Sequence, residues 1–121
     1  MNRRAAASVS VAFGLGLAVG LAARPSLAVS KGERVVLENE KVRVVEFVLE
    51  PGVPMGMHDH PRDRVEITVA GGKVRVTTPD GKTQEAEEKE GGVVFGKASP
   101  ARHDVVNIGK TVLRAYHVEL K

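Results

Sequence analysis

Short apolar runs separated by turn residues dominate the chain after residue 28. The runs are Val35–Leu37, Val42–Leu49, Val65–Val69, Val74–Thr78, Val93–Phe95, Val105–Val106 and Val112–Leu120. Eighteen residues of this part are valine, whose β-branched side chain suits a pleated, half-buried surface. No stretch sustains the 3.6-residue periodicity of a helix. The pattern therefore predicts an all-β domain, either a sandwich or a small antiparallel barrel.

Turn residues lie between these runs. Gly71-Gly72 follows one run, and Pro79-Asp80-Gly81-Lys82 is typical of a tight hairpin. The segment Gln84–Glu90 is rich in glutamate and lysine and resembles a helix fragment when read alone. Because it lies between two valine-rich runs, we expect it to form a solvated edge strand.

Residues 1–28 differ in kind from the rest. Met1–Arg4 is a short basic segment, Ala5–Ala23 has no charge, and Ser26-Leu27-Ala28 places small residues at the −3 and −1 positions of a cleavage site. This layout predicts a secretory signal peptide over 1–28, a mature domain over 29–121, and a periplasmic or secreted location. The alternative is an uncleaved membrane anchor, since an uncharged stretch of this length almost spans a bilayer.

Charge and composition exclude several classes of partner. The chain has a net charge of +3, with 18 Lys+Arg against 15 Asp+Glu, and the excess comes from Arg3, Arg4 and Arg24. The domain itself is therefore neutral and has few aromatic side chains for stacking bases, so we expect no nucleic-acid partner. With no cysteine, disulfides, thiolate metal sites and lipid attachment through cysteine are also excluded.

The histidines carry the candidate chemistry. His58 and His60 form an H-x-H pair, and residues i and i+2 of a strand project to the same face. His103 lies near the start of a later strand and offers a third imidazole. Together they form a candidate site for a transition metal, although such a pair also occurs on exposed strands without a ligand. His117 alternates with Tyr116 and other apolar residues, so we expect it on the outer face.

Two spacings sharpen this interpretation. Gly52, His58 and His60 match the pattern G-x5-H-x-H, and Gly92, His103 and Asn107 match the spacing of G-x5-P-x-G-x2-H-x3-N. The proline and glycine positions of the second pattern hold Ala98 and Pro100. Residues 33–120 thus resemble the cupin superfamily, in particular small single-domain bacterial cupins. The resemblance implies an antiparallel β-barrel, or jelly roll, with a metal site at the histidines.

The resemblance fails at the carboxylate ligand. Counting from His60, the glutamate position of the first pattern falls on Val65, and Glu66 is one residue late. An offset of one residue sends a side chain to the opposite face of a regular strand. Either a bulge within Pro61–Val65 returns Glu66 to the interior as a ligand, or the site lacks its carboxylate. The three histidines alone would still bind zinc or ferrous iron.

Two classes of function follow. One is an exported, non-catalytic protein that binds a divalent transition metal ion (iron, zinc or manganese) through His58, His60, His103 and Glu66, and a small-molecule ligand in the barrel. The other is a metal-dependent enzyme of the dioxygenase or isomerase type that acts on a small molecule. The sequence leaves this choice open. The resemblance also allows a homodimer, and no membrane contact is expected once the signal peptide is cleaved.

Overall fold

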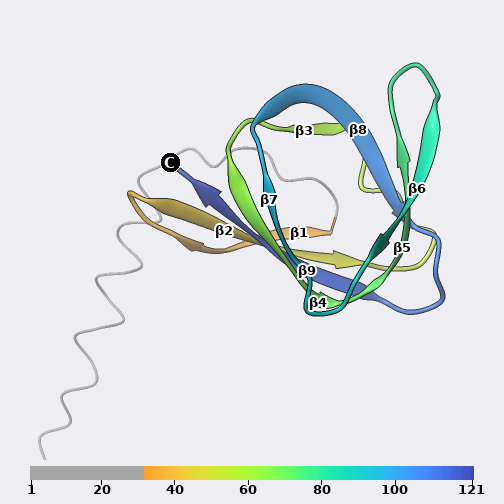
Figure 1. The fold of residues 1–121 in the computed structure, drawn as a ribbon, viewed down its shortest axis with the longest axis horizontal. Helices are drawn as coiled ribbons and strands as arrows, with labels where there is room; N and C mark the ends of the chain where they lie inside the picture. The colour runs from red at the N-terminus through yellow and green to blue at the C-terminus, as the bar shows by residue number, and fades with distance from the viewer. Residues whose placement is uncertain (1–31) are drawn as a thin grey trace, which may run out of the picture.

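The structure, a computed structural model, describes residues 32–121, and the predicted signal peptide lies outside the described residues. These residues form nine strands and no helix (Figure 1). The strands are β1 (Glu33–Glu38), β2 (Val42–Leu49), β3 (His58–His60), β4 (Arg64–Ala70), β5 (Gly72–Thr77), β6 (Thr83–Glu88), β7 (Val93–Gly96), β8 (Ser99–Asn107) and β9 (Leu113–Leu120). Over residues 32–121, the search for a helix long and apolar enough to cross a membrane finds none.

The strands form two antiparallel sheets that enclose a barrel. One sheet has the order β1-β2-β9-β4-β7 and the other the order β3-β8-β5-β6. Figure 1 shows the two sheets wrapped around a common interior. This all-β jelly roll confirms the predicted fold class. The acidic segment Gln84–Glu90 contains most of β6, which is the edge strand predicted for it.

The apolar core lies between the sheets and is centred on β2. Val45, Phe47 and Leu49 alternate along this strand and are buried. Met55, Val74 and Leu113 complete the buried cluster. Burying each such side chain stabilises the fold by about 1.5–3 kcal/mol. With six buried apolar residues, this core is small.

The side chain of Asn107 makes three hydrogen bonds at one end of the barrel. Its side chain has no solvent exposure. The Nδ2 group donates to the carbonyl oxygens of Leu49, at 2.9 Å, and Thr111, at 2.8 Å, and Oδ1 accepts from the Gly109 amide at 2.9 Å. Asn107 thus connects the end of β2 to the turn between β8 and β9. This structural role accounts for the asparagine that ends the second sequence pattern.

Candidate metal centre

The loop before the H-x-H pair is hydrogen-bonded to β8. The amide of Gly52 donates to the carbonyl of Asn107 at 2.8 Å, and that of Met55 donates to the carbonyl of Val105 at 3.1 Å. The Gly56 amide donates to the Asp104 carboxylate at 2.9 Å. These bonds hold the loop against β8, so the chain enters β3 beside the strand that carries His103.

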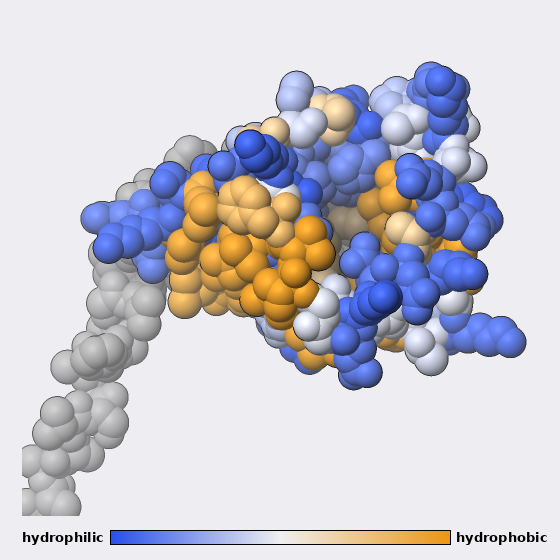
Figure 2. All heavy atoms as spheres, in the orientation of Figure 1, coloured by the Kyte–Doolittle hydropathy of each residue, from blue (hydrophilic) through white to orange (hydrophobic). Residues whose placement is uncertain are grey.

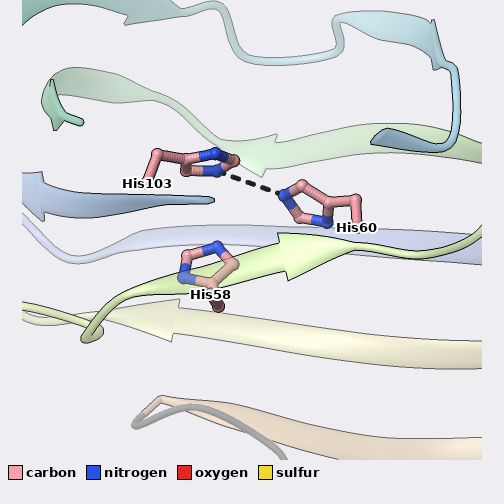
Figure 3. A group of neighbouring side chains, drawn as sticks. All are labelled: His58, His60 and His103. Atoms are coloured by element: carbon pink, nitrogen blue, oxygen red, sulfur yellow. Dashed lines mark hydrogen bonds between the residues drawn. The ribbon is translucent and has the colours of Figure 1, made fainter. Parts of the chain in front are cut away.

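Three imidazoles then converge. In the pairing of β3 with β8, His58 lies opposite His103, and His60 projects to the same face two residues later. Each of the three residues offers a ring nitrogen that lies within 4.8 Å of the other two (Figure 3). The Nε2 atoms of His60 and His103 are 3.3 Å apart. The structure therefore brings together the three histidines that the sequence singled out.

The tautomer of His58 follows from its neighbour. Its Nδ1 lies 2.8 Å from the carbonyl oxygen of Gly56. A carbonyl only accepts, so Nδ1 carries a proton, and Nε2 is the nitrogen left to bind a metal. A backbone carbonyl that holds the second ring nitrogen is the usual support of a metal-binding histidine.

A cavity of about 170 Å³ adjoins the histidines. Its apolar lining includes Phe47, Met55 and Val105. The polar lining comprises His58, His60, Arg64, Glu66, Thr68, Glu88, His103 and His117. Figure 2 shows the molecule hollowed near the centre of this view.

Burial keeps the imidazoles of His60 and His103 uncharged. It lowers the pKa of His60 to about 3, and the Arg64 guanidinium adds to this effect. Burial likewise lowers the pKa of His103, with a smaller contribution from His58. At neutral pH these side chains are therefore in the form that binds metals.

Glu66 faces the cavity, and Val65 faces outward. Residues Pro61–Asp63 are not part of a strand and connect β3 in one sheet to β4 in the other, so the alternation starts afresh at Arg64. This break, rather than a bulge inside a continuous strand, returns Glu66 to the interior. Its carboxylate pairs with Arg64 at 2.6 Å and is not in the group of convergent donor atoms, which holds the three histidines.

The prediction that His117 lies on the outer face is wrong. Its ring lines the cavity, with its centroid 4.1 Å from that of Phe47 and 5.7 Å from that of His60. Burial and Arg64 lower its pKa to about 3, and within residues 32–121 its buried Nδ1 has no hydrogen-bond partner. The prediction took the apolar residues beside His117 to be the inner face of the strand. In the structure Val118 lies on the outer face, and so does Tyr116, whose hydroxyl donates to Glu46.

Sequence reasoning missed Glu88. This residue reaches the cavity from β6, and burial together with the nearby Glu66 carboxylate raises its pKa. Its place among several exposed glutamates leaves no signal that distinguishes it in the sequence. Arg64 also lines the cavity.

No protein-family model matches the sequence, and no curated protein matches it. Solved structures do. A cupin domain protein from Bordetella pertussis Tohama I is 25% identical, with a TM-score of 0.68, over 80% of this chain and 99% of that one. An RmlC-like cupin from Methanocaldococcus jannaschii with a double-stranded β-helix fold is 21% identical, with a TM-score of 0.58, over 80% and 85%. The polyketide cyclase RemF from Streptomyces resistomycificus is 19% identical, with a TM-score of 0.55, over 75% and 66%.

The two sheets and their enclosed cavity define a double-stranded β-helix protein. Two of the matched structures are described as cupins, and they support the resemblance to the cupin superfamily that the sequence patterns suggest. The likeness shows the fold. The chemistry must be argued from the histidines and the cavity.

Proposed function

We propose that this protein binds a divalent transition metal ion through His58, His60 and His103, and a small molecule in the adjoining cavity. The convergence of the three imidazoles carries the proposal. Ligand nitrogens about 2.1 Å from a metal lie about 3.0–3.4 Å apart in octahedral or tetrahedral geometry. The Nε2 atoms of His60 and His103 already have this separation, at 3.3 Å.

The donor set fits such an ion. Neutral imidazole suits zinc, iron and other late divalent metals, and three protein ligands leave positions open for water or a ligand. Glu66 lines the same cavity from β4 of the other sheet, and we propose it as a further ligand that would have to leave Arg64 to reach the ion. A bound divalent ion would supply a Lewis acid that polarises an oxygen of the ligand.

The cavity limits the ligand. Its volume of about 170 Å³ admits only a small molecule. Apolar lining residues such as Phe47, Leu49 and Val105 suit a compact hydrocarbon body, and the histidines suit an oxygen-bearing group on it. The signal-peptide layout of residues 1–28 supports a periplasmic or secreted location for this binding protein.

A metal-dependent enzyme is the second candidate, and Glu88 is the observation that favours it. This carboxyl group lines the same cavity, and its pKa is raised by burial and by Glu66. A carboxyl group with a raised pKa holds its proton more readily and is a candidate to exchange it with a bound molecule. One matched structure is a polyketide cyclase, an enzyme that acts on a small organic substrate. The dioxygenase and isomerase types remain the reaction classes that we propose to assay.

The test is the metal content of the protein. The protein is purified without a metal-binding tag, and its metal is measured by inductively coupled plasma mass spectrometry. We expect about one equivalent of a transition metal after incubation with zinc, ferrous iron or manganese. His60→Ala/His103→Ala should lose it, and His117→Phe should retain it, because His117 lies outside the convergent group. The proposal is refuted if the protein takes up none of the three ions, or if the double variant retains the metal.

A further inference from the structure

A largely buried arginine lines the cavity. Among the described lining residues Arg64 is the only arginine or lysine, and its side chain is 11% exposed. It lies opposite Gly96 of β7, where a Cβ would come within 2.7 Å of Arg64 Cζ. The glycine therefore leaves the space that the guanidinium occupies. The guanidinium lies near enough to His60, His103 and His117 to lower the pKa of each.

This guanidinium has one carboxylate partner within residues 32–121. Its Nη2 lies 2.6 Å from Oε1 of Glu66. Its Nη1 donates to the carbonyl oxygen of Lys97 at 3.3 Å, and its buried Nε has no hydrogen-bond partner in the described part of the chain. Nε and Nη2 form the edge of a guanidinium that can bind both oxygens of one carboxylate. Glu66 therefore uses only half of the binding capacity of this edge.

The pair couples Arg64 to the metal centre. In the proposed function Glu66 is a further metal ligand, and its carboxylate lies outside the group of convergent donor atoms, so it must leave Arg64 to reach the ion. The guanidinium keeps its charge when Glu66 leaves, because arginine does not lose its proton in proteins. A largely buried charge without a partner is strongly destabilising. Another anion is therefore required in place of the Glu66 carboxylate.

We propose that the small molecule in the cavity is a carboxylate, and that Arg64 binds its carboxylate group once Glu66 has turned to the metal. This inference rests on the proposed function and names the chemical class of the ligand. A carboxylate at the Nε and Nη2 edge can accept from both donors, including the Nε group that now has no partner. The apolar lining residues Phe47, Leu49 and Val105 suit the hydrocarbon part of such a molecule.

The charges around the cavity favour this coupling. Without a metal, Arg64 and Glu66 neutralise each other, so a second carboxylate gains little. A divalent ion beside uncharged imidazoles adds positive charge, which a carboxylate ligand offsets. Glu88 would oppose an anion in its ionised form, but burial and Glu66 raise its pKa and so favour the neutral form. The metal and the carboxylate should therefore strengthen each other's binding, and by the same factor.

The test uses zinc (or manganese or ferrous iron if zinc is not taken up) and isobutyrate, with uncharged isobutyramide as the matched control compound. Isothermal titration calorimetry in a buffer free of carboxylates measures the dissociation constant of the ion with and without each compound. For the wild-type protein we expect isobutyrate to tighten metal binding by about tenfold or more, and isobutyramide to change it by less than about twofold.

Two variants separate Arg64 from the ion. Arg64→Gln should bind the ion at least as tightly as the wild-type protein does, because Glu66 is then free, and isobutyrate should change this affinity by less than about twofold. Glu66→Gln removes the carboxylate partner of Arg64 without any metal. In metal-free protein this variant should bind isobutyrate and not isobutyramide in a nuclear magnetic resonance titration, whereas the wild-type protein should bind isobutyrate about tenfold more weakly or not at all.

The outcomes distinguish this inference from the proposed function. If the wild-type protein binds the ion and isobutyrate leaves the affinity unchanged, the inference is overturned and the metal site stands. An equal effect of isobutyrate on the wild-type protein and on Arg64→Gln would also overturn it, because the carboxylate would then act on the ion alone. If no ion binds, the proposed function fails, and failure of metal-free Glu66→Gln to bind isobutyrate would overturn the carboxylate site as well. Circular dichroism checks that both variants fold, and the wild-type measurement decides the coupling without them.

Discussion

Replacement of Asn107 by alanine tests how the barrel is held closed. Asn107 has no solvent exposure, and its side chain makes three hydrogen bonds, to Leu49, Gly109 and Thr111. Alanine removes all three and leaves two carbonyl groups and one amide without these partners.

The expected loss is large for a domain of this size. A buried backbone group deprived of its partner costs about 1–3 kcal/mol, as for Leu49, and the partly buried bonds to Gly109 and Thr111 cost less each, so the total is about 2–5 kcal/mol. A domain of this size typically has only about 5–15 kcal/mol of stability. We therefore expect Asn107→Ala to be partly unfolded or to have lost about half of its free energy of unfolding.

Urea unfolding followed by circular dichroism measures this change. The matched control is Asn39→Ala, because the Asn39 side chain accepts hydrogen bonds from the Lys41 and Val42 amides at an exposed turn. Water can replace those bonds, so the control should lose about 1 kcal/mol or less. The reasoning fails if Asn107→Ala also loses less than about 1 kcal/mol, or if the two variants are equally destabilised.

Two further predictions concern a buried imidazole and two glycines. In metal-free protein the folded His117 has a pKa of about 3 against 6.5 in the unfolded chain, so acidification protonates the unfolded chain first and lowers stability. The wild-type protein should therefore lose free energy of unfolding between pH 6.5 and 5, and His117→Phe should make that loss smaller by about 2 kcal/mol. Urea unfolding at each pH measures the difference. A variant with the same pH dependence as the wild-type protein would contradict this. Gly71→Ala should cost about 2–3 kcal/mol, because its Cβ would lie 2.4 Å from the Glu88 carbonyl oxygen. Gly52→Ala, with a φ of 77° and open space around it, should cost only about 1 kcal/mol, and thermal unfolding should separate the two.

The sequence predicts most strands because their apolar runs are bounded by turn residues. The run Val42–Leu49 coincides with β2, for example. The prediction fails for β8, of which it includes only Val105–Val106. Most of the other residues of Ser99–Asn107 are polar, and they form a strand because they pair with β3 and β5. Non-local pairing of this kind leaves no trace in local composition.

The sequence predicts the direction of individual side chains less well than it predicts the positions of the strands. Hydrophobicity identifies the inner face only where the outer face is polar, and here the outer face carries Val65 and Val118. The inward direction of His117 was therefore misassigned, and the offset at Glu66 could not be resolved. The convergence of His58 and His60 was predictable, because i and i+2 share a face in any strand.

The central claim is that His58, His60 and His103 hold one metal ion, and anomalous diffraction from crystals of the metal-loaded protein tests it most directly. The account predicts a single anomalous peak about 2.0–2.3 Å from one ring nitrogen of each of the three histidines. For His58 the bound nitrogen should be Nε2, since its Nδ1 donates to Gly56. A peak only at surface carboxylates, or three imidazoles with no ion between them in crystals soaked with zinc, iron or manganese, would contradict it.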